Sequence, residues 1–151
     1  MLPTERSARA ASFRLHLVAL MRRLRQSAEA DSETWTGLMI LGAIERLEGA
    51  ATPSLISTEM ELRSSNVAAI LRELERRNLI TRSADPHDKR MVRLALTPTG
   101  SDFVKVARAK RDTWLLHAMA DCLSDEEQER LLAAGELMSR LASWRGSSRR
   151  G

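Results

Sequence analysis

The chain has 151 residues, of which 43% are hydrophobic and 29% are charged, and this balance is typical of a soluble globular protein of about one domain. Its 24 Lys and Arg residues exceed its 20 Asp and Glu residues, so the formal charge of +4 permits nucleic-acid binding without requiring it. Because no apolar run approaches the roughly 18 residues of a membrane span, and the single Cys excludes an internal disulfide, we expect a cytoplasmic protein.

The first predicted helix covers residues 12–29. Its apolar residues recur at intervals of three and four, which places them along one side of a helix. They are Phe13, Leu17, Leu20, Met21, Leu24 and Ala28. A stripe of this kind is normally buried, and the last helix of a second copy of the chain is one partner for it. Burial within a single chain is the simpler alternative.

The second predicted helix covers about residues 35–47, after a cluster of N-capping residues at 31–34. It is apolar on most sides, which indicates the central buried helix of the domain. Thr52 followed by Pro53 has the pattern of a helix cap and a first helical residue. A short third helix is therefore predicted from Pro53 to Met60.

A helix from Ser64 to Arg77 follows after three residues, so the two helices fit a helix-turn-helix. Its apolar residues fall on one face, while its other face begins with short polar groups that suit entry into the major groove of DNA. The residues predicted to contact DNA from this helix are Ser64, Ser65, Asn66, Ala69, Arg72 and Arg76. An ordinary amphipathic surface helix is the alternative.

Two β-prone segments, about 80–83 and 91–96, flank the polar stretch ADPHDKR and predict a hairpin with a charged tip. A hairpin that follows a helix-turn-helix is a wing. Lys89 and Arg90 at its tip are predicted to contact phosphates or the minor groove of DNA. We expect Asp88 to form an ion pair with Arg82 or with Arg90.

The C-terminal third is predicted to be helical. Thr97 and Pro98 repeat the cap-and-proline pattern and begin a long helix that extends to about Asp121. Ser124 and Glu127 form a capping box, which begins a final helix that extends to about Trp144. The small, basic tail at 145–151 is expected to be disordered.

Residues 85–100 resemble the wing signature D-P-x-D-x-R-x-x-x-x-x-L-T-x-x-G of the MarR family of bacterial transcription regulators. The preceding run LERRNLITR, residues 74–82, is similar to that family's L-E-x-x-G-L-[IV]-x-R. The resemblance implies a mostly α fold with a small β-hairpin wing, a winged helix-turn-helix with long N- and C-terminal dimerisation helices. It implies one MarR-like domain over 1–151, with dimerisation helices at 12–29 and 98–144 and a winged core at 34–97.

The resemblance also implies a function. A homodimer would bind palindromic promoter DNA in a sequence-specific way and act as a repressor that a small, often phenolic, ligand releases. Three departures limit this transfer. Ala68 and Ala69 stand where the family often has a Thr and a longer polar residue, so the sequence preference cannot be transferred. Asn78 replaces the usual Gly after the recognition helix, and Asn is the next-best residue for a left-handed C-cap. Arg63 stands where a capping Ser is common, so Ser64 or Ser65 is expected to cap the helix instead.

Four residues are candidates for an effector site: Arg14, Trp35, Trp114 and His117. A tryptophan would stack on an aromatic ligand, and Arg14 or His117 would bind its acid group. The alternative is that both tryptophans lie in the core or in a dimer interface.

The sequence contains no phosphate-binding loop or nucleophile elbow, so an enzyme and a cofactor are not expected. His117 and Cys122 are too few ligands for a metal site. Cys122 is interpreted as a buried packing residue, with a thiol-based redox-sensing regulator as the alternative. A winged-helix dimer that serves as a protein-interaction module is the other alternative.

Overall fold

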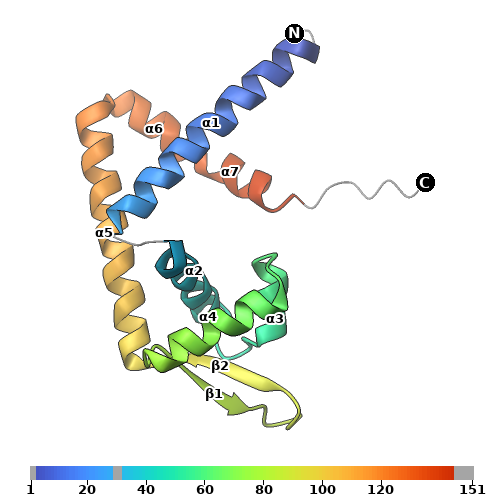
Figure 1. Cartoon of the computed structure of the whole chain (residues 1–151). Helices are drawn as coiled ribbons and strands as arrows, with labels where there is room; N and C mark the ends of the chain where they lie inside the picture. The colour runs from blue at the N-terminus through green and yellow to red at the C-terminus, as the bar shows by residue number, and fades with distance from the viewer. Residues whose placement is uncertain (1–2, 29–31, 145–151) are drawn as a thin grey trace. The chain divides into compact units, whose positions relative to one another are not determined.

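The computed structural model describes residues 3–28 and 32–144. Within these ranges it contains seven α-helices and one antiparallel hairpin, so the prediction of a mostly helical chain with a small wing is confirmed (Figure 1). The elements are α1 (Pro3–Ser27), α2 (Ser32–Arg46), α3 (Pro53–Glu59), α4 (Ser64–Arg76), β1 (Ile80–Ala84), β2 (Val92–Leu96), α5 (Pro98–Cys122), α6 (Asp125–Ala133) and α7 (Gly135–Ala142). Over the described residues, no helix is both long enough and apolar enough to cross a membrane.

The chain forms two compact units, residues 1–112 and 113–151, which divide within α5. The hydrophobic core of the N-terminal unit is built by α2, α3, α4, the hairpin and the first turns of α5. The contribution of α2 is the largest, and its core residues are at most 3% exposed: Leu38, Ile40, Leu41, Ala43 and Ile44. The prediction that the second helix is the central buried one is therefore confirmed.

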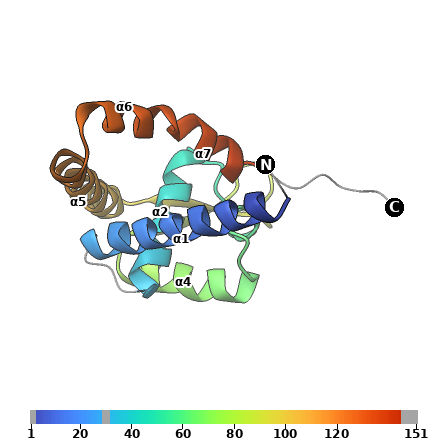
Figure 2. The same cartoon turned by 90° about the horizontal axis from the view of Figure 1, so that it is seen from above.

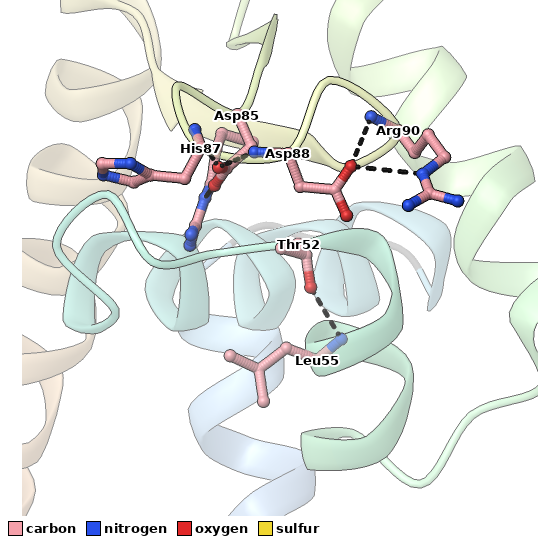
Figure 3. Close-up of polar contacts among 7 residues, drawn as sticks. Thr52, Leu55, Asp85, His87, Asp88 and Arg90 are labelled. Atoms are coloured by element: carbon pink, nitrogen blue, oxygen red, sulfur yellow. Dashed lines mark hydrogen bonds and ion pairs between the residues drawn. The ribbon is translucent and has the colours of Figure 1, made fainter.

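Three helix starts follow their sequence signals. The hydroxyl of Thr52 accepts a hydrogen bond from the Leu55 N–H at 3.2 Å, before Pro53 at the first helical position (Figure 3). The hydroxyl of Thr97 accepts one from the Gly100 N–H at 2.9 Å. At the start of α6 the predicted capping box between Ser124 and Glu127 is present in both directions. These caps satisfy N–H groups that the helices themselves leave without a partner.

Both helices of the helix-turn-helix end with a residue other than Gly in the left-handed region. Asn78 has a φ of 56° after α4, and Glu61 has a φ of 52° after α3. At the end of α4, the Asn78 N–H donates to the Glu75 carbonyl and the Leu79 N–H donates to the Leu74 carbonyl, both at 2.9 Å. This is the Schellman pattern, so the left-handed cap predicted at Asn78 is confirmed. Glu61 has the same role in the helix-turn-helix turn, which contains no Gly.

Three boundaries differ from the prediction. α1 begins at Pro3 and not near residue 12, because the Ala- and Arg-rich run before the apolar stripe also favours a helix. The single final helix that was predicted is two helices, since the chain turns at Ala134 before Gly135, a poor helix former (Figure 2). No side chain caps α4: Arg63 is the N-cap, so the prediction that Ser64 or Ser65 caps this helix is wrong.

The start of the second helix also differs: α2 begins at Ser32, so residues 32–34 of the predicted capping cluster lie inside the helix and do not precede it. The tail at 145–151 lies outside the described part of the chain, so its prediction cannot be compared with the structure.

Candidate nucleic-acid interface

The exposed face of α4 carries every residue of this helix that was predicted to contact DNA. Its opposite face is buried through Val67, Leu71 and Leu74, each at most 3% exposed. These three residues recur at intervals of four and three, so the rest of the helix circumference remains open to solvent. The exposed residues there include Ser64, Ser65, Asn66, Ala69, Arg72 and Arg76.

The first turn of α4 contacts α3 through hydroxyl groups. The Ser57 hydroxyl donates to the Leu62 carbonyl at 2.7 Å, and the Ser64 hydroxyl lies 3.3 Å from the Ser57 oxygen. Since the Ser57 hydrogen is already donated, Ser64 is the donor of this second bond. Ser64 is therefore directed at α3, which explains why it does not cap its own helix.

The hairpin is attached to the helix-turn-helix through backbone contacts. Its strands pair from Ile80 opposite Leu96 to Ala84 opposite Val92. The Leu94 N–H, which faces away from β1, donates to the Ala51 carbonyl just before α3 at 2.9 Å. The wing consequently has a fixed position relative to α3.

A second connection joins the end of the wing to the end of α4. The Thr97 hydroxyl donates to the Asn78 carbonyl at 2.6 Å, and the Thr97 N–H donates to the Leu79 carbonyl at 3.1 Å. A Cβ atom at Gly100 would lie 1.9 Å from the Leu79 carbonyl oxygen, so only Gly fits here. The L-T-x-x-G part of the signature thus packs the start of α5 against the end of the recognition helix.

The wing tip is organised by Asp85, whose side chain is only 3% exposed. One carboxylate oxygen accepts hydrogen bonds from the Asp88 N–H at 2.9 Å and the His87 N–H at 2.7 Å (Figure 3). The other oxygen forms an ion pair with Arg93. The hydrogen bonds from Asp88 and His87, followed by that from Arg93, lower the pKa of Asp85 from 3.8 to about 2. Asp85 therefore remains charged and holds the loop in one conformation.

Sequence reasoning did not include Asp85 or Arg93 among the site residues. The available signal was the Asp-Pro pair at the start of the wing signature, to which no contact was assigned. An Asp at the start of a tight loop often accepts backbone N–H groups two or three residues later, as Asp85 does.

The wing-tip cations extend into solvent. Arg90 has a side chain that is 95% exposed, and Lys89 is also exposed. The Asp88 carboxylate accepts a hydrogen bond from the Arg90 N–H at 3.0 Å and lies 3.5 Å from its Nε atom. Of the two ion pairs predicted for Asp88, the one with Arg90 is present.

The ion pair between Arg82 and Asp88 is absent, and that prediction is wrong. Arg82 instead pairs with Glu75 of α4, with 2.9 Å between Nε and Oε2. In β1, Arg82 lies opposite Leu94, in the middle of the hairpin and away from the tip, so the helix supplies its partner. The Glu75–Arg82 pair is a further connection between the recognition helix and the wing.

Arg76 also has an acidic partner on its own helix. Its Nε and Nη2 atoms bind the two carboxylate oxygens of Glu73 at 2.8 and 2.7 Å. This hydrogen bonding lowers the pKa of Glu73 and raises the pKa of Arg76. Both side chains remain largely exposed, at 49% and 74%.

Among the predicted effector residues, Trp35 lines a hollow. Its volume is about 470 Å³, and its other lining residues come from α1: Met21, Arg22, Arg25 and Gln26. The guanidinium carbon of Arg111 lies 5.5 Å from the centre of the Trp35 ring. Arg14 is exposed on α1 and does not line this hollow. Trp114 and His117 belong to the C-terminal unit, so the four-residue site stays a prediction.

Cys122 is exposed at the end of α5, so its interpretation as a buried packing residue is wrong. It is the last residue of its helix, where the chain turns toward α6 and leaves the side chain uncovered. In the described part of the chain, no three His, Cys, Asp or Glu side chains gather as a metal site requires.

The chain is similar in sequence and fold to proteins described as regulators of transcription. The model of a family described as MarR matches residues 34–91. A solved Pseudomonas aeruginosa structure, described as a transcriptional regulator, is 43% identical with a TM-score of 0.83, and the match covers 95% of this chain and 99% of that one. A point mutant of MepR from Staphylococcus aureus, bound to an oligodeoxyribonucleotide, is 25% identical with a TM-score of 0.62, over 89% of this chain and 96% of that one. The transcriptional repressor MdtR of Bacillus subtilis is 29% identical, over 86% of this chain and 83% of its own length.

Proposed function

Because the chain belongs to the MarR family of winged helix-turn-helix transcription regulators, we propose that it is a homodimeric repressor, active in the cytoplasm, that binds palindromic promoter DNA. As a member of that family it is a DNA-binding regulator and not an enzyme. Repression is proposed by analogy with MdtR, whose name describes it as a repressor.

The observation that carries the proposal is the rigid attachment of the wing to a recognition helix with an uncovered face. The Leu94 N–H donates to the Ala51 carbonyl shortly before α3, and the Thr97 hydroxyl donates to the Asn78 carbonyl at the end of α4. The exposed face of α4 and the charged wing tip therefore keep a constant separation. In a dimer, the two recognition helices would enter successive major grooves, with half-sites about one helical turn apart, and the wings would reach the flanking minor grooves.

Different residues would supply affinity and sequence preference. Ser65, Asn66 and Arg72 are proposed to contact base edges or nearby phosphates, and the methyl group of Ala69 suits contact with thymine. Arg90 is proposed to enter the minor groove, where the negative potential is concentrated, with Asp88 as its orienting partner.

Exposed apolar residues on the outer helices support a homodimer. On α1, Phe13, Leu15, Val18, Leu20 and Met21 are between 37% and 57% exposed. In the C-terminal unit, the exposed apolar residues include Leu131, Leu132, Leu137, Leu141 and Trp144. Helices that carry this much apolar surface need a partner, and a second copy of the chain offers the same surfaces in a symmetric arrangement.

A small acidic aromatic ligand is proposed as the effector. The hollow beside Trp35 offers an aromatic ring for stacking, and Arg22 and Arg25 line it with positive charge. Binding there would alter the separation between the recognition helices of the two subunits, so that affinity for the operator decreases. A phenolic acid is the chemical class that fits this combination.

The experiment is a fluorescence-anisotropy titration of the protein against its own upstream intergenic DNA and a random duplex, at two salt concentrations. We expect tighter binding to the upstream DNA and a steep salt dependence on both duplexes. Arg90→Ala is expected to weaken binding to both and to flatten the salt dependence, whereas Asn66→Ala changes the preference among sequences.

Three results would redirect the proposal. Equal effects of the two substitutions on both duplexes would contradict the division between affinity and readout. Weak binding to both duplexes by the unmodified protein would favour a protein-interaction module. Peroxide-dependent release that Cys122→Ser abolishes would favour a redox regulator.

A further inference from the structure

We infer that Glu73 is a specificity-determining residue of the DNA interface, because it engages Arg76 and thereby limits sequence-independent binding to phosphates. The inference rests on the proposed DNA-binding function. It concerns a positioning residue, since Glu73 acts through the guanidinium of Arg76.

The pair uses two of the five N–H donors of Arg76. Both carboxylate oxygens of Glu73 are used, one by Nε at 2.8 Å and the other by Nη2 at 2.7 Å. A guanidinium has five N–H groups, and this side-on contact occupies one whole edge of it. The N–H groups that remain, on Nη1 and on the outer side of Nη2, point in directions that the pair fixes.

Arg76 lies on the exposed face. Ser65, Ala69, Arg72 and Arg76 follow one another at intervals of four, three and four, and this stripe lies opposite the buried stripe of Val67, Leu71 and Leu74. An arginine in that place, one turn beyond Arg72, is expected to bind any phosphate within reach. Its side chain is 74% exposed, so burial does not restrain it.

Glu73 is on the same side of the helix, where a carboxylate repels DNA. An unpaired negative charge beside a phosphate backbone lowers affinity for every sequence. When the carboxylate is paired with Arg76, the two charges largely cancel, so the pair neither attracts nor repels phosphates strongly. Without Glu73, Arg76 would be one more cation that binds phosphates whatever the DNA sequence. With Glu73, the pair has no net charge.

A purely structural role accounts for this pair poorly. The neighbouring pair, Glu75 with Arg82, joins α4 to β1 and so connects two elements. Glu73 and Arg76 are three residues apart on one helix, and their pair joins no two elements. Exposed ion pairs of this kind add little to stability. Its main effect is on the electrostatic potential of the DNA-facing surface.

The inference predicts the behaviour of Glu73→Gln. An unpaired Arg76 becomes available for one phosphate contact in each subunit, and each contact steepens the salt slope by about 0.9. A dimer would then have a slope steeper by about 1.8, and each contact strengthens binding to random DNA by about fivefold near 0.15 M salt. Random DNA, on which no base contacts fix the helix and Arg76 can take the nearest phosphate, gains more than the operator, so the ratio between the two affinities falls.

The test uses the full-length protein with a random duplex and the upstream duplex, titrated by fluorescence anisotropy at four or more salt concentrations. The variants are Glu73→Gln, Arg76→Ala and the double substitution. Glu126→Gln is the matched control, because it removes the same charge and breaks an exposed pair with Arg130 at 3.2 Å on α6. We expect tighter random binding and a steeper slope for Glu73→Gln alone, and neither change when Arg76 is also replaced.

Each other outcome overturns the inference. A salt slope of Glu73→Gln equal to that of the unmodified protein would show that Arg76 does not reach a phosphate. If Glu126→Gln changes random-DNA binding as much as Glu73→Gln does, the change in net charge explains the effect. If the double variant still binds random DNA more tightly, the effect comes from the loss of the Glu73 charge and not from Arg76. If the unmodified protein does not distinguish the two duplexes, the proposed function fails together with this inference.

Discussion

Replacement of Gly100 by Ala tests the packing of α5 against the recognition helix. A Cβ atom at this position would lie 1.9 Å from the Leu79 carbonyl oxygen and 2.8 Å from the carbonyl carbon. Non-bonded carbon and oxygen atoms rarely approach closer than about 3 Å, so the two segments must separate by about 1 Å. Both contacts are with backbone atoms, which cannot move aside as a flexible side chain does.

The cost follows from the bonds that this separation breaks. The Thr97 hydroxyl donates to Asn78 at 2.6 Å, and the Thr97 N–H donates to Leu79 at 3.1 Å. The loss of two partly buried hydrogen bonds costs about 1 kcal/mol each, and residual overpacking adds about 1–3 kcal/mol. The expected total is about 3–5 kcal/mol of unfolding free energy, a large part of the roughly 5–15 kcal/mol of a typical domain.

The assay is urea denaturation followed by circular dichroism, at one subunit concentration because dimerisation contributes to stability. Gly135→Ala is the matched control: no atom lies within 4 Å of its added Cβ, and Ala favours a helix over Gly by about 0.5–1 kcal/mol. The first variant should be strongly destabilised and the second slightly stabilised. If Gly100→Ala unfolds at the midpoint of the unmodified protein, the proposed close contact between α5 and Leu79 is refuted.

Substitutions at three further positions test single features of the fold. The pKa of Asp85 is lowered from 3.8 to about 2, so its carboxylate stabilises the folded state above pH 4, and this stabilisation is lost as the pH falls toward 2. In Asp85→Asn, the urea midpoint should therefore not decrease between pH 4 and pH 2 through this group. Asn78→Ala should cost about 1 kcal/mol because Ala disfavours the left-handed φ of 56°, whereas Asn78→Gly should unfold near the unmodified midpoint. Ser124→Ala should lower the stability of α6 by about 1 kcal/mol through loss of its cap, and unchanged thermal melting would contradict this.

Local signals in the sequence were sufficient for three of the helix caps and for the core helix. Thr52, Thr97 and Ser124 each precede a helix and cap it through an N–H group three residues later, so neighbouring residues determine the outcome. The run of apolar residues in α2 likewise needs no tertiary information, because a helix that is apolar on most sides has to be buried.

Contacts between distant segments could not be predicted in the same way. Asp88 and Glu75 are both acidic residues near Arg82 in the sequence, and only the position of β1 beside α4 selects Glu75. The end of α5 was predicted within one residue, but the exposure of Cys122 depends on contacts with other segments, which the residues around it do not define. The final helix is interrupted after Ala134 because Gly135 is a poor helix former. The capping box at the start of this helix gives no information about where it is interrupted.

Apart from Arg90 and its partner Asp88, the residues of the wing signature and the residues proposed to contact DNA belong to different sets. Asp85, Thr97 and Gly100 make contacts inside the protein: with the wing loop, with the end of α4 and with the Leu79 carbonyl. Such contacts fix where the recognition helix and wing lie, and a chain that shares them shares the architecture. The exposed face of α4, by contrast, contributes nothing to the core, so Asn66 and Ala69 can differ between relatives without any change in fold. Resemblance in the signature therefore indicates a shared architecture but does not transfer the operator sequence, which would depend on the exposed face of α4.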